Sequence, residues 1–237
     1  GYGNAINVMR AVRDFERAGV AGIHIEDQEA PKRCGHMKGK LLISEEEMAG
    51  KIRAAIDARE DDDFVIIART DARGAAGGSL DLAIRRALVY AKAGADVIFS
   101  EFTVPSAEEA ERLAKEIHAE YPGKPLWFNY STAFKWHQSP LSFDRLAELG
   151  FNIITLPLQV TRSIIIGAWD FLTELKAKRE KAVYEQEKRL EGHPTEDYHE
   201  FGGFPDIVKL EERYLPKEEI QKKYAESEGL IRIKSKK

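Results

Sequence analysis

The 237-residue sequence has a single cysteine, Cys34. One cysteine excludes a framework of internal disulfides and a metal site built from several cysteines. Long hydrophobic runs are also missing, since the longest, residues 164–172, is interrupted by Asp170 and is far shorter than the roughly 20 apolar residues of a membrane-spanning helix. The sequence therefore predicts neither a disulfide-stabilised protein nor a membrane protein.

An excess of basic residues is absent as well. There are 36 Lys and Arg against 40 Asp and Glu, giving a formal net charge of −4, and only residues 234–237 form a short basic tail. Nucleic-acid-binding proteins usually carry a basic surface. No signal-peptide pattern occurs at the N-terminus, because charged residues interrupt it. We therefore expect a soluble, cytoplasmic, globular protein that binds neither nucleic acid nor membranes.

Five short apolar segments of strand length alternate with longer helical patterns. The strand candidates are residues 21–25, 64–68, 96–99, 125–128 and 152–155, and the helices between them are expected at about 44–59, 80–93, 106–120 and 141–149. Two of these helices open with a capping box, in which Ser44 and Ser106 satisfy free backbone N–H groups. Alternation of this kind predicts an α/β protein with a parallel sheet.

Polar side chains follow every one of the five predicted strands. They are Glu26 and Asp27, Arg69 and Asp71, Glu101, Asn129 and Ser131, and Thr155. Polar groups delivered to one rim by successive strands are typical of a (β/α)8 TIM-type barrel, whose active site lies at that end of the strands. An open doubly wound sheet would instead show a glycine fingerprint after a strand, and none is found here. The barrel is therefore the preferred fold.

The strand count falls short of the eight that a closed barrel needs. Either some strands escape recognition, or the barrel is N-terminally incomplete in this chain and its first three strands lie upstream of Gly1. We expect the second, because no other stretch of the sequence has strand character. On this interpretation, residues 1–175 form a partial barrel that carries the catalytic residues.

The sequence after the fifth predicted strand changes to helical patterns rich in charge. A helix is expected over residues 159–190, a connector over 193–205 and a last helix over 206–228. Charged helices with few apolar positions rarely fold alone. We therefore expect a C-terminal helical extension over residues 176–237 that packs on a neighbouring subunit.

The loop after the first predicted strand, residues 28–40, surrounds Cys34 with His36 and four cations: Lys32, Arg33, Lys38 and Lys40. Nearby positive charge favours the thiolate form of a cysteine, which suits it to proton transfer. An ordinary exposed cysteine in a solvated basic loop is compatible with the same composition. A zinc site is disfavoured, because no second Cys/His pair exists to complete it.

The other rim residues suit a magnesium ion and a ligand with several carboxylates. Glu26 and Asp27 offer carboxylate oxygens, which Mg²⁺ prefers, and Arg69 offers a planar fork that matches a carboxylate. Asn129, Ser131 and Thr155 add neutral donors. Simpler alternatives remain open, namely an ion pair between Arg69 and one of the two acids and helix caps for the neutral residues.

Taken together, these segments resemble the isocitrate lyase and phosphoenolpyruvate mutase superfamily. The similar segments are GYGN at residues 1–4, HIEDQ at 24–28, KRCGH at 32–36, ARTDA at 68–72 and NYSTAFKW at 129–136, and the resemblance spans roughly residues 1–170. The cysteine segment is the most specific, because it resembles the signature loop of the lyase branch. An Asp-x-Asp metal motif expected just upstream of GYGN is absent, which agrees with the expectation of upstream strands.

The resemblance implies a (β/α)8 barrel, bound Mg²⁺ and a homotetramer that exchanges C-terminal helices between subunits. It implies retro-aldol cleavage of a small-molecule hydroxy-tricarboxylate, after which Cys34 protonates the succinate carbon. Carried over by position, the catalytic residues are Cys34, His36 and Glu101, the substrate-binding residues are Gly35, Arg69, Asn129, Ser131 and Thr155, and the metal ligand is Glu26.

Features of both lyases of this branch occur in the sequence. The segment 129–136 and Thr155 resemble isocitrate lyase, which releases glyoxylate and succinate, whereas Phe99, Ala133 and Ile153 leave room for the extra methyl group of 2-methylisocitrate. One methylene is worth only about 1–3 kcal/mol of discrimination, so such substitutions can reverse a preference. We expect isocitrate as the substrate, with 2-methylisocitrate as the alternative. A catalytically silent assembly subunit is the expectation from another class.

Overall fold

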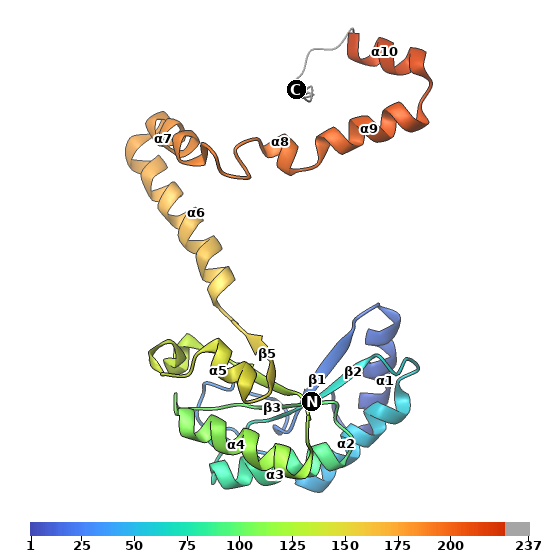
Figure 1. Ribbon diagram of the computed structural model, residues 1–237, viewed down its shortest axis with the longest axis vertical. Coiled ribbons are helices and arrows are strands. Elements are labelled where there is room, and N and C mark those ends of the chain that lie inside the picture. Colours follow the sequence, from blue (N-terminus) through green and yellow to red (C-terminus); the bar gives the residue numbers. More distant parts are fainter. Residues whose placement is uncertain (226–237) are drawn as a thin grey trace. The chain divides into compact units, whose positions relative to one another are not determined.

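The structure is a computed structural model, and it describes residues 1–225 (Figure 1). The chain divides into two compact units, Gly1–Thr161 and Arg162–Lys237, and the boundary predicted after residue 175 falls within helix α6 (Gln159–Lys178). The basic tail at 234–237 and residues 226–228 of the last predicted helix lie outside the described residues. None of the helices in residues 1–225 combines the length and the hydropathy that a membrane span requires.

The first unit is built on a parallel sheet of five strands. In chain order they are β1 (Gly22–Glu26), β2 (Val65–Thr70), β3 (Val97–Ser100), β4 (Leu126–Asn129) and β5 (Phe151–Thr155), and the sheet order is β1-β2-β3-β4-β5. This confirms the predicted α/β class. Each strand pairs with the strand before it, as in the wall of a barrel, and the five described strands form an open sheet.

Helices follow the strands as the sequence predicts. They are α1 (Ala5–Arg17), α2 (Glu45–Ala58), α3 (Leu80–Lys92), α4 (Ala107–Glu120) and α5 (Phe143–Glu148), with short 3-10 turns at Ala72–Gly74, Thr132–Phe134 and Trp136–Gln138. The serine half of each predicted capping box is confirmed, because the hydroxyl of Ser44 accepts from the N–H of Glu47 and that of Ser106 accepts from the N–H of Glu109, whereas the carboxylate of Glu109 pairs with Arg73. Each cap satisfies a backbone donor that the helix itself leaves free.

The two faces of the sheet have different surroundings because successive strand residues point to opposite sides. Ile25, Ile66 and Ile98 belong to the main core, which the strands share with the helices along one side of the sheet (Figure 1). Ile67 and Phe99 belong to a smaller core cluster on the opposite face. By the same alternation, the side chains at the ends of the strands, beginning with Glu26 and Arg69, project on the face of the smaller cluster.

The second unit is helical. It contains most of α6, then α7 (Glu180–Leu190), α8 (Tyr198–Phe201), α9 (Phe204–Tyr214) and α10 (Lys217–Ala225). The single helix expected over residues 159–190 is wrong, because α6 ends at Lys178 and α7 begins at Glu180, with Arg179 between them at a φ of 51°. Within α6, Ile164 is 68% exposed, Trp169 is 71% exposed and Leu172 is 59% exposed. The helical extension is therefore present, with a large apolar surface.

Candidate active site

The parallel register of the sheet brings the predicted rim residues to one end of the strands. Glu26 closes β1 opposite Arg69 of β2, and Asn129 closes β4 opposite Thr155 of β5. Glu101 follows directly after β3, and its backbone N–H donates to the carbonyl of Thr70 at the end of β2. The rim predicted from the sequence is therefore a real feature of this fold.

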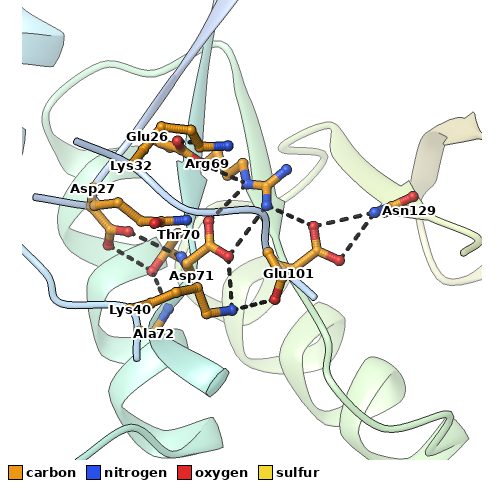
Figure 2. Close-up of polar contacts among 12 residues, drawn as sticks. Glu26, Asp27, Lys32, Lys40, Arg69, Thr70, Asp71, Ala72, Glu101 and Asn129 are labelled. Carbon is orange, nitrogen blue, oxygen red and sulfur yellow. Dashed lines mark hydrogen bonds and ion pairs between the residues drawn. The ribbon is translucent and has the colours of Figure 1, made fainter. Parts of the chain in front are cut away.

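Arg69 lies at the centre of three carboxylates (Figure 2). Its Nε is 2.9 Å from Oδ2 of Asp71 and 3.3 Å from Oε2 of Glu26, and its Nη2 is 2.9 Å from Oε2 of Glu101. The guanidinium also lies over the ring of Phe99, 4.7 Å from the ring centroid. We call Arg69 with Glu26, Asp71 and Glu101 the Arg69 cluster.

Nη1 of Arg69 is the one guanidinium nitrogen that makes no contact with the carboxylates of the Arg69 cluster. Nε and Nη2 carry all the contacts to the cluster, and Nη1 makes no hydrogen bond to any described residue (Figure 2). The side chain is 11% exposed. Arg69 therefore keeps N–H donors for an added carboxylate while the cluster holds its orientation.

The three carboxylates of the Arg69 cluster are not equivalent. Burial raises the pKa of Glu26 and of Glu101, against the opposing effect of Arg69. Burial acts in the same direction on Asp71, but the hydrogen bond from Arg69 and the positive charges of Arg69 and Lys40 lower the pKa of Asp71 to about 2. Asp71 is therefore the permanent counter-ion of the cluster, and the two glutamates take up protons more readily.

Asn129 is held by the cluster through Glu101. Its Nδ2 donates to Oε1 and Oε2 of Glu101 at 3.0 and 3.2 Å. Because the amide nitrogen faces Glu101, the amide oxygen faces away, and Oδ1 is buried with no hydrogen-bond partner among the described residues. Glu101 thus orients the amide of Asn129.

The loop that carries the cysteine is tied to the strand ends at several points. We call residues 29–41 the Cys34 loop; at its base Gln28 and Leu42 form an antiparallel bridge. The side chain of Gln28 pairs with the backbone of Arg33, donating to its carbonyl at 3.0 Å and accepting from its N–H at 2.9 Å. Within the loop, Lys40 is buried and its Nζ donates to the carbonyl of Gly35 at 2.5 Å.

Two of the four cations expected around Cys34 have other partners. Nζ of Lys40 is 3.1 Å from Oδ1 of Asp71, with both side chains fully buried, and Nζ of Lys32 is 3.0 Å from Oε1 of Glu26. Cys34 itself is exposed. These two charges are therefore shared with carboxylates of the Arg69 cluster, and the effect of the loop's charge on the thiol stays a prediction.

His36 and Ser131 come together from separate loops. Nε2 of His36 and Oγ of Ser131 are 3.0 Å apart, and Ser131 is fully buried. Burial and the charge of Arg69 lower the pKa of His36, which favours the neutral imidazole. The ring of Phe134 packs edge-on against His36 at 4.6 Å. The Cys34 loop is thus joined to the loop after β4.

Thr155 is engaged elsewhere. Its Oγ1 accepts a hydrogen bond from Nε1 of Trp127 on the neighbouring strand β4. No contact in the described structure joins Thr155 directly to the Arg69 cluster. Its position at the end of β5 still places it on the same rim.

Asp27 is not a free ligand for a cation. Its Oδ2 accepts from Oγ1 of Thr70 at 2.8 Å, from Nη1 of Arg86 at 3.0 Å and from the hydroxyl of Tyr90 at 2.8 Å, and its Oδ1 accepts from the N–H of Asp71 at 3.0 Å. The suggestion that Asp27 joins Glu26 at a metal is therefore wrong. Adjacent strand residues face opposite sides of a sheet, a signal that could have separated the two acids from the sequence alone.

The ion-pair alternative for Glu26 is confirmed by its contacts with Lys32 and Arg69. Among the described residues, no group of three or more His, Cys, Asp or Glu is arranged to hold a metal. Oε2 of Glu26 is nevertheless buried without a hydrogen bond, and Lys32, which pairs with the other oxygen, is 49% exposed. Mg²⁺ often binds through one or two protein carboxylates, with water and substrate oxygens completing its shell. Glu26 fits one such position.

Comparison with known families agrees with this arrangement. Residues 1–175 match the family described as phosphoenolpyruvate phosphomutase. The chain belongs to this family. Its solved relatives include a 2,3-dimethylmalate lyase described as a member of the PEP mutase/isocitrate lyase superfamily, with 30% identity and a TM-score of 0.68. The family resemblance expected from the sequence is thereby confirmed.

Curated relatives with different substrates in their names match over most of the chain. An isocitrate lyase from Haloferax volcanii is 40% identical over 97% of this chain and 66% of its own length. A 2-methylisocitrate lyase from Aeropyrum pernix is 42% identical over 75% of this chain and 54% of its own length. A 2,3-dimethylmalate lyase from Eubacterium barkeri is 44% identical over 73% and 57%. The chain thus spans between half and two thirds of the length of these relatives.

Solved structures confirm the barrel-type fold. A phosphoenolpyruvate phosphomutase from Streptomyces platensis subsp. rosaceus has a TM-score of 0.76 at 32% identity, over 91% of this chain and 71% of that one. A phosphonopyruvate hydrolase in complex with oxalate and Mg²⁺ has a TM-score of 0.72 at 31% identity, over 91% and 70%. These structures are of the TIM-barrel type, with which the sequential parallel sheet agrees.

Proposed function

We propose that this chain carries part of the active site of a carbon–carbon lyase that cleaves isocitrate to glyoxylate and succinate. The observation that carries the proposal is the rim where the Arg69 cluster, Asn129 and the joined pair His36–Ser131 lie beside a loop with one exposed cysteine. The curated relatives named isocitrate lyase and 2-methylisocitrate lyase support this class of reaction.

The product carboxylates have natural positions on this rim. Nη1 of Arg69 would bind the carboxylate of the departing keto acid, because this nitrogen is not used by the cluster. Asn129, Ser131 and Thr155 would hold the succinate half through an amide and two hydroxyl groups. Glu101 would act by keeping the amide of Asn129 in place.

The reaction itself is a retro-aldol cleavage. A general base takes the hydroxyl proton as the oxygen forms the new carbonyl, and the electron pair of the broken C–C bond passes to the succinate carbon as an aci-carboxylate dianion. Cys34 would donate its thiol proton to that carbon, and the resulting thiolate would regain a proton from solvent, to which Cys34 is exposed.

Gly35 allows the Cys34 loop to lie directly against Arg69, since even a Cβ at Gly35 would be 2.5 Å from Nη2 of Arg69.

Magnesium is the proposed cofactor. One solved relative, the phosphonopyruvate hydrolase, is a complex with Mg²⁺. Glu26 would supply one carboxylate of the site, and the ion when bound would stabilise the negative charge that develops on the keto-acid oxygens.

Two side chains on the sheet, Phe99 and Ile153, favour a second candidate substrate, 2-methylisocitrate. Phe99 lies under the guanidinium of Arg69 and Ile153 is 36% exposed on β5. Phe99 and Ile153 are smaller than the side chains that would exclude an extra methyl group, and two relatives with this substrate in their names are 42% and 34% identical to the chain. In that case the keto acid is pyruvate.

Product analysis tests both candidates. Full-length protein with Mg²⁺ is given isocitrate or 2-methylisocitrate at equal concentration, and glyoxylate and pyruvate are measured. More glyoxylate supports the proposal, more pyruvate supports the second substrate, and the absence of both favours a catalytically silent assembly subunit. A Cys34→Ser variant should lose turnover with an unchanged melting temperature. Full activity in that variant would rule out the thiol as proton donor.

We further propose that the full-length protein is a homotetramer in which the C-terminal helices exchange between subunits. The exposed apolar side chains of α6, among them Ile164, Trp169 and Leu172, support this proposal. Several large apolar side chains exposed together usually mark an interface. Light scattering measures the mass in solution. Trp169→Glu should lower it, with Lys176→Ala as a control on the same helix, and an unchanged mass for Trp169→Glu would contradict the proposal.

A further inference from the structure

Lys40 is a buried lysine at the inner end of the Cys34 loop. The residue is 1% exposed, and lysine is rarely buried to this degree unless it is paired. Its ammonium group donates to Oδ1 of Asp71 at 3.1 Å (Figure 2). It also donates to the carbonyl of Gly35 at 2.5 Å. One side chain therefore joins the middle of the loop to the end of strand β2.

Both ends of this connection matter for the site. Asp71 is fixed from two other directions, because Asp27 accepts from its backbone N–H at 3.0 Å and Arg69 donates to its carboxylate at 2.9 Å. Gly35 lies between Cys34 and His36 in the sequence. The ammonium of Lys40 thus holds the residue between the two proposed catalytic side chains against a rigid part of the sheet.

The backbone of Lys40 makes a second connection. Its carbonyl accepts from the N–H of Ala76 at 3.0 Å, in the loop that follows β2. A Cβ on Gly74 in the same loop would approach Nζ of Lys40 to 3.1 Å, so this loop packs closely on the lysine. Lys40 is therefore in contact with two loops and with the strand end between them.

We propose that Lys40 is a positioning residue, which fixes the carbonyl of Gly35 to Asp71 and so sets the place of Cys34 and His36 beside the Arg69 cluster. The inference rests on the proposed function for the catalytic role of Cys34. The order of the loop itself is independent of any activity and can be measured separately.

Hydrogen exchange of the full-length protein, read by mass spectrometry, measures the loop directly. In the unmodified protein the peptide covering residues 33–37 should be protected. Lys40→Met should make this peptide exchange about tenfold faster, because the loop opens locally while the strands stay closed. Lys38→Met is the matched control, since Lys38 is exposed in the same loop, and it should leave exchange unchanged.

Steady-state kinetics supply the functional half of the test. Lys40→Met should lower kcat by about 10²-fold, as expected for misplacement of reacting groups by about 1 Å, and should leave KM nearly unchanged because Arg69 still binds the substrate. Lys40→Gln, which keeps a donor for Gly35, should retain more activity than Lys40→Met. Lys115→Met, at an exposed lysine of α4 away from the site, should behave as the unmodified enzyme.

Each result decides the inference. Unprotected exchange of residues 33–37 in the unmodified protein would overturn it without any variant, even if the variants of Lys40 do not fold. Loss of kcat without faster loop exchange would assign Lys40 a direct chemical role instead. Faster exchange with full kcat would show that loop order is not needed. If the unmodified protein releases neither glyoxylate nor pyruvate, the proposed function fails, while the exchange data still report whether Lys40 orders the loop.

Discussion

Gly35 is the position where the smallest substitution should have a large effect on activity. A Cβ at Gly35 would lie 2.5 Å from Nη2 of Arg69, 3.1 Å from Oδ1 of Asp71 and 3.2 Å from Cγ of Glu101. Carbon and nitrogen atoms in contact are normally about 3.5 Å apart, so the loop or the guanidinium must move by about 1 Å. Displacements of this size cost about 10²-fold in rate, equivalent to about 3 kcal/mol of transition-state stabilisation.

The assay is kcat/KM of Gly35→Ala with whichever substrate the unmodified protein prefers. Gly39→Ala is the matched control in the same loop. Gly39 has a φ of +83° and no atom within 4 Å of the added Cβ, so alanine there adds backbone strain of about 1 kcal/mol without a collision. Gly39→Ala should lower the melting temperature slightly and keep kcat/KM. If Gly35→Ala retains activity within about threefold of the unmodified protein, the close approach to Arg69 does not position the site.

Three further predictions concern stability. The folded pKa of Asp71, about 2, is below the unfolded value of about 3.9. Ionised Asp71 therefore stabilises the fold by about 2–3 kcal/mol above pH 4, and this stabilisation is lost as the pH falls towards 2. The unfolding free energy measured in urea should depend less on acid pH in Asp71→Asn, and an identical pH dependence would contradict the assignment. Tyr90→Phe removes one of four donors to the buried carboxylate of Asp27 and should lower the unfolding free energy by about 1–3 kcal/mol, whereas no loss would mean that the other donors suffice. Arg73 and Glu109 form a bidentate pair with both contacts at 2.7 Å, for which a double-mutant cycle should give a coupling of about 1 kcal/mol; additive single losses would show that the pair contributes nothing.

The strands and helices of the first unit could be predicted from local patterns. The strand expected at residues 125–128 is observed at Leu126–Asn129, and the helix expected at 80–93 is observed at Leu80–Lys92. Buried parallel strands leave continuous apolar runs, and serine caps mark where helices begin. Because parallel strands end at one rim, the neighbourhood of Glu26, Arg69 and Glu101 followed from the same pattern.

The partners of individual charges could not be predicted in this way. Lys40 looks like any other lysine of a basic loop, and its burial depends on Asp71, which lies 31 residues later in the chain. Asp27 is bound by Arg86 and Tyr90 of α3, whose inward faces are set by the packing of that helix on the sheet. The local sequence shows that a residue is charged, but it does not show which residue that charge pairs with in the folded protein. The helix boundary at Arg179 could not be predicted either, because the helical sequence pattern continues through this residue although its φ is 51°.

The sequential order of the strands has a consequence for how this part of the chain folds. Each strand pairs with the strand that precedes it, from β1 through β5. Pairing each strand with the next one in the chain closes shorter loops than pairing strands farther apart in the sequence would, and so costs less entropy. The sheet can therefore grow in one direction while the chain is still leaving the ribosome, with each new βα unit docking on a completed edge. On this route the Arg69 cluster is assembled only when β3 has joined, so the first two strands must hold the carboxylates of Glu26 and Asp71 in place before Glu101 arrives.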